Sequence, residues 1–170
     1  LRGARDSAKS LLRILDDLLD WSKIEEGKLE LAPQPTAIGR LVSDLVNTYS
    51  RIASSKRLVL EPRVDPDLSP VLVVDPLRLS QVLGNFLSNA LKFSPRGATV
   101  HVKIEPDQAA GGIRVAVADE GPGIAPEDLP HIFNRFYQGR RQGTQTVAGS
   151  GVGVALAKKI VEGHHGNIWV

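Results

Sequence analysis

The segment from Gln81 to Phe93 combines two stripes of one helix, and it constrains the fold more than any other part of the chain. Its apolar residues recur at helical spacing and define a buried face; they are Val82, Leu83, Phe86, Leu87, Ala90 and Leu91. Gln81, Asn85, Asn89 and Lys92 form a second, polar stripe. Asparagine is a poor residue inside a helix because its amide competes for backbone hydrogen bonds. Two amides and an ammonium on one stripe therefore suit a metal ion and phosphates, the alternative being a solvated or capping pair.

Two glycine-rich segments add to this signal. Asp119 follows a strand-like stretch and precedes Gly121 and Gly123, which predicts a carboxylate facing a cleft beside a tight turn. Residues 149–153 form a glycine-rich loop that opens a helix, where backbone N–H groups and the helix dipole attract phosphate. This loop matches neither a Walker A loop nor a dinucleotide fingerprint. The alternatives are an ordinary turn at Asp119 and a flexible loop at 149–153.

The rest of the chain alternates helical and strand-like patterns, which predicts an α+β domain preceded by one long amphipathic helix. Helices are expected over 7–28, 38–55, from Pro76 to about Ser94, and over 152–162, with a short one from Pro126 through Phe133. Strands are expected over 57–64, 71–74, 99–104, 113–118 and 166–170. Pro33 and Pro35 mark a break and a domain boundary, and the polar segment 140–148 is predicted to be a mobile loop.

The first helix carries a strong leucine stripe that needs a partner helix, in this chain or in a second copy. Its members are Leu11, Leu12, Leu15, Leu18 and Leu19.

Composition excludes several classes of protein. There is no cysteine among the 170 residues, so disulfides and thiolate metal sites are impossible. A net charge of +2 is too small to indicate nucleic-acid binding. No apolar run approaches the roughly 20 residues that span a bilayer, so we expect no direct membrane contact. Leu1 is not a start methionine, and we expect the chain to be part of a larger protein.

Four short motifs, in this order, resemble the ATP-binding catalytic domain of sensor histidine kinases, a branch of the superfamily shared with gyrase, mismatch-repair and heat-shock chaperone ATPases. Residues 85–93 (NFLSNALKF) resemble the N box, and 119–124 (DEGPGI) the first glycine box. Residues 132–137 (IFNRFY) are similar to the F box, and 149–153 (GSGVG) to the second glycine box. Residues 11–31 resemble the second helix of the family's dimerisation and phosphotransfer hairpin.

The resemblance implies a Bergerat-type two-layer α/β sandwich, a mixed sheet covered by helices. Residues 1–31 would be part of the hairpin and residues 32–170 the catalytic domain, which would lack its last strand and expose a sheet edge. It also implies ATP and Mg²⁺ as cofactors, a homodimer formed through the hairpin, and a response-regulator receiver as partner. The expected location is cytoplasmic, and the resemblance is compatible with an intact protein that is anchored in a membrane and with one that is not.

Residue roles follow from the same resemblance. Asp119 would accept a hydrogen bond from the adenine amine, Asn85 would bind Mg²⁺, and Asn89 and Lys92 would contact phosphate or metal. Arg135, with Arg140 or Arg141, would neutralise charge on the transferred phosphoryl group. The expected catalytic residues are thus Asn85, Lys92 and Arg135, with Asn85 as the metal ligand. The expected nucleotide-binding residues are Asn85, Asn89, Lys92, Phe93, Asp119, Gly121, Gly123, Ile124, Tyr137, Arg140, Gly149, Ser150, Gly151, Val152 and Gly153. The alternative for Tyr137, with Phe133 and Phe136, is a core or lid-anchoring role.

The chain departs from the family pattern in two functional respects. None of its four histidines has the setting of the family's phosphoacceptor, so we expect transfer to a histidine outside this chain and no autophosphorylation of the chain by itself. Gln81 stands where strongly hydrolytic relatives carry a glutamate base, which predicts slow ATP hydrolysis. The competing hypotheses are a non-catalytic docking module with this fold and another ATPase of the superfamily.

Overall fold

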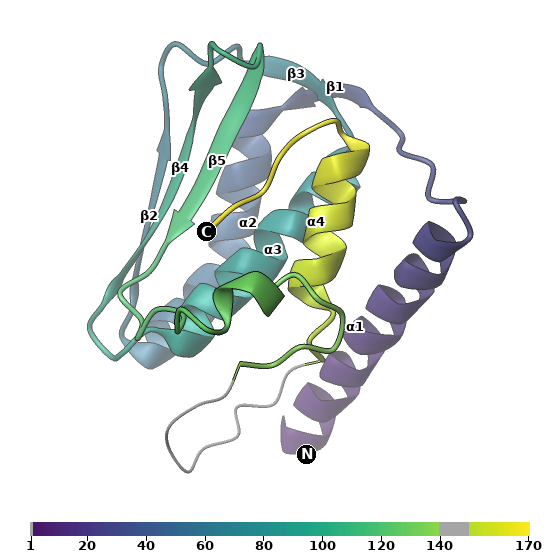
Figure 1. The fold of residues 1–170 in the computed structure, drawn as a ribbon. Helices are drawn as coiled ribbons and strands as arrows, with labels where there is room; N and C mark the ends of the chain where they lie inside the picture. Colours follow the sequence, from purple (N-terminus) through teal and green to yellow (C-terminus); the bar gives the residue numbers. More distant parts are fainter. Residues whose placement is uncertain (1, 140–149) are drawn as a thin grey trace. The chain divides into compact units, whose positions relative to one another are not determined.

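The computed structural model describes residues 2–139 and 150–170 (Figure 1). The chain divides into two compact units. The sheet unit comprises Ala32–Gly123, and the helical unit comprises Leu1–Leu31 together with Ile124–Val170. Within the described ranges, no helix is long and apolar enough to cross a membrane.

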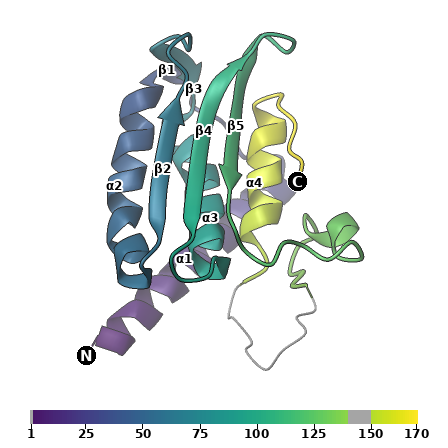
Figure 2. The ribbon, with the colours of Figure 1, turned by 90° about the vertical axis from the view of Figure 1, so that its left-hand side faces the viewer.

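A three-stranded mixed sheet forms one layer of the sheet unit (Figure 2). The strands are β2 (Val59–Val64), β4 (Thr99–Asp107) and β5 (Gly112–Ala118), with β4 in the middle. β4 is parallel to β2 and antiparallel to β5. Val100, Val102 and Ile104 alternate along β4 as buried residues, which is the pattern of a sheet with one covered face. The strands expected over 99–104 and 113–118 are both present, and β4 continues past its expected end through Pro106 to Asp107.

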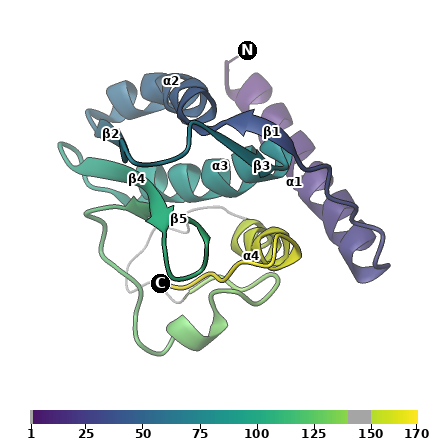
Figure 3. The same ribbon diagram turned by 90° about the horizontal axis from the view of Figure 1, so that it is seen from above.

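Two helices cover one face of this sheet (Figure 3). They are α2 (Ile38–Lys56) and α3 (Pro76–Phe93), and both lie close to the bounds expected from the sequence. Their apolar faces meet β4 in one continuous core that includes Val42, Leu87 and Leu91. The sheet unit is therefore a two-layer α/β arrangement, and the predicted α+β fold with a mixed sheet covered by helices is confirmed.

A short two-stranded ribbon joins the ends of these helices. β1 (Gln34–Ala37) pairs antiparallel with β3 (Val71–Val74). We had taken Pro33 and Pro35 for a break in the chain, so β1 was missed. Proline is tolerated there because β1 is an edge strand, and the N–H groups on its open side have no neighbouring strand to bond.

The helical unit contains α1 (Arg2–Glu25), the 3₁₀ turn η1 (Leu129–His131) and α4 (Gly153–Gly163). α1 contacts α4 within this unit. Leu11, Leu12 and Leu19 on α1 are each 61 % exposed, so the leucine stripe remains largely uncovered among the described residues.

Two expectations for the helical unit are wrong. The helix expected from Pro126 through Phe133 is reduced to the three residues of η1, because Pro130 has no N–H to donate to a longer helix. Residues 166–170 do not form the expected strand. The predicted mobile loop, 140–148, falls outside the described residues. The predicted division into domains 1–31 and 32–170 stays a prediction.

Candidate nucleotide-binding site

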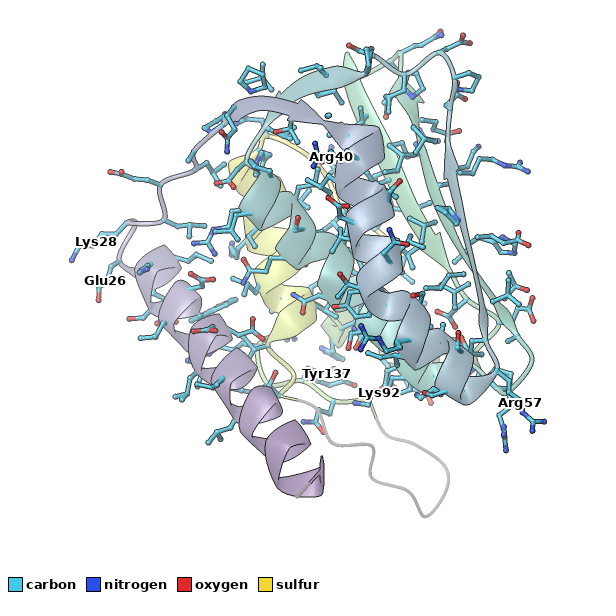
Figure 4. All side chains as sticks on the ribbon, turned by 180° about the vertical axis from the view of Figure 1, so that it is seen from behind. Glu26, Lys28, Arg40, Arg57, Lys92 and Tyr137 are labelled. Atoms are coloured by element: carbon cyan, nitrogen blue, oxygen red, sulfur yellow. The ribbon has the colours of Figure 1, made fainter. Side chains whose placement is uncertain are left out.

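The polar stripe of α3 is partly inside the sheet unit. Asn85 is only 9 % exposed, while Gln81, Asn89 and Lys92 are half-buried. A buried amide is costly unless its polar atoms are satisfied, so the position of Asn85 does not fit a freely solvated pair. Lys92 is labelled in Figure 4, and its ammonium lies 5.0 Å from the centre of the Phe93 ring.

Contacts from α2 fix the position of α3. The Tyr49 hydroxyl donates to the Gly84 carbonyl oxygen at 3.1 Å, and the Lys56 ammonium donates to the Leu91 carbonyl oxygen at 2.7 Å. A Cβ atom at Gly84 would lie 3.0 Å from the Tyr49 oxygen, which leaves little room for a side chain. These bonds bracket the stretch that carries both asparagines, so α3 presents them in a defined orientation.

Asp75 caps the start of α3 and ties it to the preceding segment. Its carboxylate accepts hydrogen bonds from the backbone N–H groups of Arg78 at 3.0 Å and Ala32 at 2.9 Å. Burial raises the pKa of this carboxyl group, but the bonds from the backbone at Ala32, Arg78 and Leu77 and the Arg78 charge outweigh burial. The pKa of Asp75 is therefore lowered, and its charged form stabilises the fold.

The turn after β5 approaches the end of α3 closely. Asp119 is exposed at the end of this strand, and its Oδ1 accepts a hydrogen bond from the Gly121 N–H at 2.7 Å. A Cβ at Gly121 would lie 2.5 Å from that oxygen and 3.3 Å from the Phe93 carbonyl oxygen. Gly123 has a φ of +73°, which favours glycine. The structure thus brings Asp119 and Gly121 together with Phe93, which belongs to a different sequence motif.

Among the described residues, the sheet unit is hollowed at two places near the predicted elements. The smaller hollow, about 180 Å³, is lined by residues of α2 and α3 that include Tyr49, Lys56 and Lys92. The larger, about 430 Å³, runs along β1 and α2 and contains none of the predicted nucleotide-binding residues.

Gly151 in the helical unit packs directly on the F-box backbone. Its carbonyl oxygen accepts a hydrogen bond from the Phe136 N–H at 2.9 Å. A Cβ at Gly151 would lie 2.8 Å from the Phe136 Cα atom, and the φ of Gly151 is +67°. Phe136 is itself left-handed, with a φ of +62°, which is uncommon for a bulky residue. The second glycine motif is therefore built for this close approach.

The other predicted nucleotide-binding residues of the helical unit differ in their burial and hydrogen bonds. The Tyr137 hydroxyl donates to the buried Asp128 carboxylate at 2.6 Å, which fits the anchoring alternative. Ser150 Oγ accepts a hydrogen bond from the Val152 N–H at 3.3 Å. Val152 is fully buried, Gly153 begins α4, and Ile124 is exposed. The predicted residues Arg140 and Gly149 lie outside the described part of the chain, as does Arg141.

Arg135 is engaged with α1. Its Nη1 donates to Glu25 Oε1 at 3.0 Å, and its guanidinium carbon lies 5.3 Å from the Trp21 ring centre. The ring of Phe136 lies 4.5 Å from the same carbon. Sequence analysis did not find this cluster, because Glu25 and Arg135 stand 110 residues apart and no local pattern connects them.

Comparison with known proteins agrees with this geometry. The family model described as histidine kinase-, DNA gyrase B- and HSP90-like ATPase matches residues 74–170. The aerobic respiration control sensor protein ArcB homolog of Haemophilus influenzae is 38 % identical over 156 residues, which are 92 % of this chain and 47 % of the relative. The sensor histidine kinase WalK of Bacillus subtilis is 31 % identical over 97 % of this chain and 27 % of the relative.

Solved structures point the same way. The crystal structure of full-length ShkA in complex with AMPPNP has a TM-score of 0.79 and 28 % sequence identity, covering 95 % of this chain and 32 % of that one. The fold is also similar to that of the Acinetobacter baumannii histidine kinase AdeS, with a TM-score of 0.73.

Fold and motifs together define an ATP-binding domain of the superfamily shared by kinases, gyrase and chaperones. Within it, the chain belongs to the histidine kinase-, DNA gyrase B- and HSP90-like ATPase family, as the ATP-dependent catalytic domain of a two-component sensor histidine kinase. The chain spans about half the length of the Haemophilus relative and 13 % of the next, the Bordetella bronchiseptica virulence sensor BvgS.

Proposed function

We propose that the domain transfers the γ-phosphoryl group of ATP to a histidine on an adjoining dimeric hairpin, for relay to an aspartate of a response-regulator receiver. The observation that carries this proposal is the close approach of the Asp119–Gly121 turn to Phe93, at the end of the helix that presents Asn85 and Asn89. The carboxylate that we propose to recognise adenine and the stripe that we propose to bind phosphate both belong to the sheet unit. The family model spans both this part and the second glycine motif.

The site residues divide by chemistry. Asp119 is exposed and aimed by its bond to Gly121, so it can accept a hydrogen bond from an adenine amine. Lys92 supplies an ammonium charge for phosphate. Phe93 and Gly123 line the adenine end through backbone that passes close to the ligand, with Ile124 as an apolar neighbour. We assign Gly151, Val152 and Gly153, with Ser150 and Tyr137, to the binding of the phosphates at the start of α4. Arg140 and Gly149 would complete that set.

The polar stripe of α3 has the chemistry to bind Mg²⁺ jointly with the phosphates of ATP. Mg²⁺ takes oxygen ligands and commonly binds through one or two protein groups plus substrate phosphates and water. Asn85 would supply an amide oxygen and Asn89 a second polar group beside it. Among residues 2–139 and 150–170, no group of three or more acidic or histidine residues forms a metal site of its own. Bound Mg²⁺ would offset negative charge on the phosphates during transfer.

Gln81 favours transfer over hydrolysis. Its amide oxygen accepts a hydrogen bond from Arg78 Nη1 at 2.8 Å. A neutral amide cannot accept the proton of an attacking water, whereas an acceptor imidazole brings its own nucleophilic lone pair. The arrangement therefore supports a slow ATPase and an efficient phosphotransfer step.

The exposed leucine stripe on α1 supports dimerisation through a helical hairpin. Leucines with about half or more of their surface exposed, along one face of a helix, are typical of a face that a partner helix covers. A homodimer and a receiver domain are the protein partners of this proposal, and we expect a cytoplasmic location.

Calorimetric titration of the chain with ATP and ADP, with and without Mg²⁺, tests the nucleotide site. The variant Asp119→Asn replaces the charged acceptor of the proposed adenine contact by a weaker, neutral amide. Asp67→Asn is the matched control because Asp67 is an exposed carboxylate in the loop between β2 and β3. We expect ATP binding that Mg²⁺ strengthens, a loss of at least about tenfold in Asp119→Asn, and no change in Asp67→Asn. A folded chain that binds no nucleotide, or an Asp119→Asn variant that binds normally, would contradict the proposal.

A further inference from the structure

Gly84 lies inside α3, where a glycine needs a structural reason. Glycine in a helix interior is less favourable than alanine because its unfolded backbone has more conformations to lose. Gly84 is buried and stands directly before Asn85. A Cβ atom at Gly84 would lie 3.0 Å from the hydroxyl oxygen of Tyr49 and 3.9 Å from Cζ, the ring carbon that carries this oxygen. The glycine therefore leaves room for one group, the Tyr49 hydroxyl.

The Tyr49 hydroxyl acts on the peptide group that leads into Asn85. It reaches across from α2 and donates a hydrogen bond to the Gly84 carbonyl oxygen at 3.1 Å. This oxygen and the N–H of Asn85 belong to the same planar peptide group. A bond at the oxygen therefore restrains the plane from which the Asn85 backbone continues.

Packing between α2 and α3 is incomplete beside this bond. The smaller hollow, about 180 Å³, opens between the two helices, and it is lined by Tyr49, Ile52, Lys56, Ser88, Leu91 and Lys92. Side chains that border a hollow lose contact atoms on one side, so packing restrains the helices less there. A specific hydrogen bond between the helices consequently matters more for the position of α3 at this level.

We propose that Tyr49 and Gly84 are positioning residues for Asn85, the proposed Mg²⁺ ligand. The Tyr49 hydroxyl fixes the peptide group before Asn85, and Gly84 makes room for that hydroxyl. Mg²⁺ demands near-ideal octahedral geometry, so a small displacement of Asn85 should weaken metal binding. The proposed adenine contact of Asp119 lies on the turn after β5 and should change little. This inference rests on the proposed function, because it takes Asn85 as a metal ligand.

Three variants separate positioning from packing. Tyr49→Phe removes the hydroxyl and keeps the ring. Gly84→Ala keeps the hydroxyl but obliges it to shift, because the new Cβ would lie 3.0 Å from its oxygen. In the double variant this conflict disappears, since the nearest ring carbon is 3.9 Å away. Thr48→Val is the matched control, because Thr48 is an exposed residue of α2 whose hydroxyl donates to Asp44 of the same helix at 2.8 Å.

Calorimetric titration of the whole chain with ATP, in Mg²⁺ and in EDTA, gives the factor by which Mg²⁺ strengthens binding. Tyr49→Phe and Gly84→Ala should each reduce this factor by about threefold to tenfold, at or below the usual range for partners bonded directly to a ligating side chain. ATP affinity in EDTA should not change, and Thr48→Val should change neither quantity.

The double variant gives the sharpest comparison. Gly84→Ala should lower the melting temperature of the wild-type chain, but it should not lower that of Tyr49→Phe, because the hydroxyl with which the new Cβ conflicts is gone. The Mg²⁺ factor of the double variant should nevertheless stay as low as that of Tyr49→Phe. Stability would thus be recovered without recovery of metal binding.

Hydrogen exchange followed by NMR reports the contact without nucleotide or metal. Tyr49→Phe should speed exchange of the Asn85 backbone amide more than that of Leu79, which is in the same helix but farther from the bond. Thr48→Val should leave both rates unchanged. Equal acceleration at Asn85 and Leu79 would indicate a general loss of stability and would contradict the positioning role.

Other results would also overturn the proposal. These are an unchanged Mg²⁺ factor in Tyr49→Phe, the same reduction in Thr48→Val, or a Mg²⁺ factor that the double variant restores. If the wild-type chain binds ATP equally well with and without Mg²⁺, the metal role of Asn85 in the proposed function fails, and this inference fails with it. A normal Mg²⁺ factor in the wild type and in every variant would refute this inference alone.

Discussion

Replacing Asp75 tests how the start of α3 is stabilised. The carboxylate is only 5 % exposed and accepts bonds from two backbone N–H groups that stand 46 residues apart in the chain, those of Ala32 and Arg78. Loss of a helix N-cap costs about 1 kcal/mol, and loss of a hydrogen bond to a charged group costs about 1.5–3 kcal/mol. We therefore expect Asp75→Ala to lower the free energy of unfolding by about 2–4 kcal/mol.

The variant Asp75→Asn separates the charge from the hydrogen bonds. The amide oxygen keeps an acceptor for the cap, so the loss at neutral pH should be about 1–2 kcal/mol. Because the pKa of Asp75 is lowered in the folded state, its stabilisation is complete above the unfolded pKa of about 3.9 and is lost as the pH falls through the folded pKa. The difference in stability between wild type and Asp75→Asn should therefore narrow below about pH 4.

The assay is urea denaturation followed by circular dichroism at several pH values, with Asp67→Asn as the control for loss of an exposed carboxylate. Folded domains are stable by about 5–15 kcal/mol, so a change of this size is easily measured. A loss below about 0.5 kcal/mol in Asp75→Ala, or a difference between wild type and Asp75→Asn that does not change with pH, would refute this account of the α3 start.

Three further changes have expected outcomes. Gly151→Ala should destabilise the chain by at least about 2 kcal/mol in thermal unfolding. The φ of Gly151 is positive, and the new Cβ would lie 2.8 Å from the Phe136 backbone. Gly39→Ala is the control, because a Cβ at Gly39 meets open space. Arg57→Gly should raise the free energy of unfolding by about 0.5–1 kcal/mol in urea denaturation. Arg57 follows α2 in the left-handed region that favours glycine, and its side chain projects from that end of the helix (Figure 4). No gain would mean that the Arg57 side chain makes a compensating contribution. Gln81→Glu should raise ATP hydrolysis, measured as phosphate release, by about tenfold or more, and an unchanged rate would remove Gln81 from the hydrolytic site.

The bounds of α3 were predictable from the sequence because several signals coincide there. Asp75 and Pro76 mark its start, apolar residues recur at helical spacing, and Pro95 follows its end. β1 was not predictable, because an edge strand tolerates Pro35 and four residues give too little pattern.

The candidate site was predictable where chemistry is local to a motif. Asp119 and Gly121 were identified as one turn, and the structure shows the bond between them. The cluster of Trp21, Glu25 and Arg135 depends on tertiary contact between segments far apart in the chain, and none of these residues is unusual in its own surroundings. Such contacts can be found only from the three-dimensional structure.

The parallel pairing of β2 with β4 has a consequence for the order of folding. β4 and β5 are joined by a short turn, so their hairpin can close early, whereas β2 can pair with β4 only after the intervening segment with α3 has been accommodated. Closing the chain over such a separation is slow, because the chain loses conformational entropy before the strands form their stabilising contacts. Weakening the β4–β5 hairpin should therefore slow refolding in stopped-flow kinetics, while weakening β2 should mainly speed unfolding. During synthesis, β2 therefore stays unpaired until β4 has been made, which is after the whole of α3.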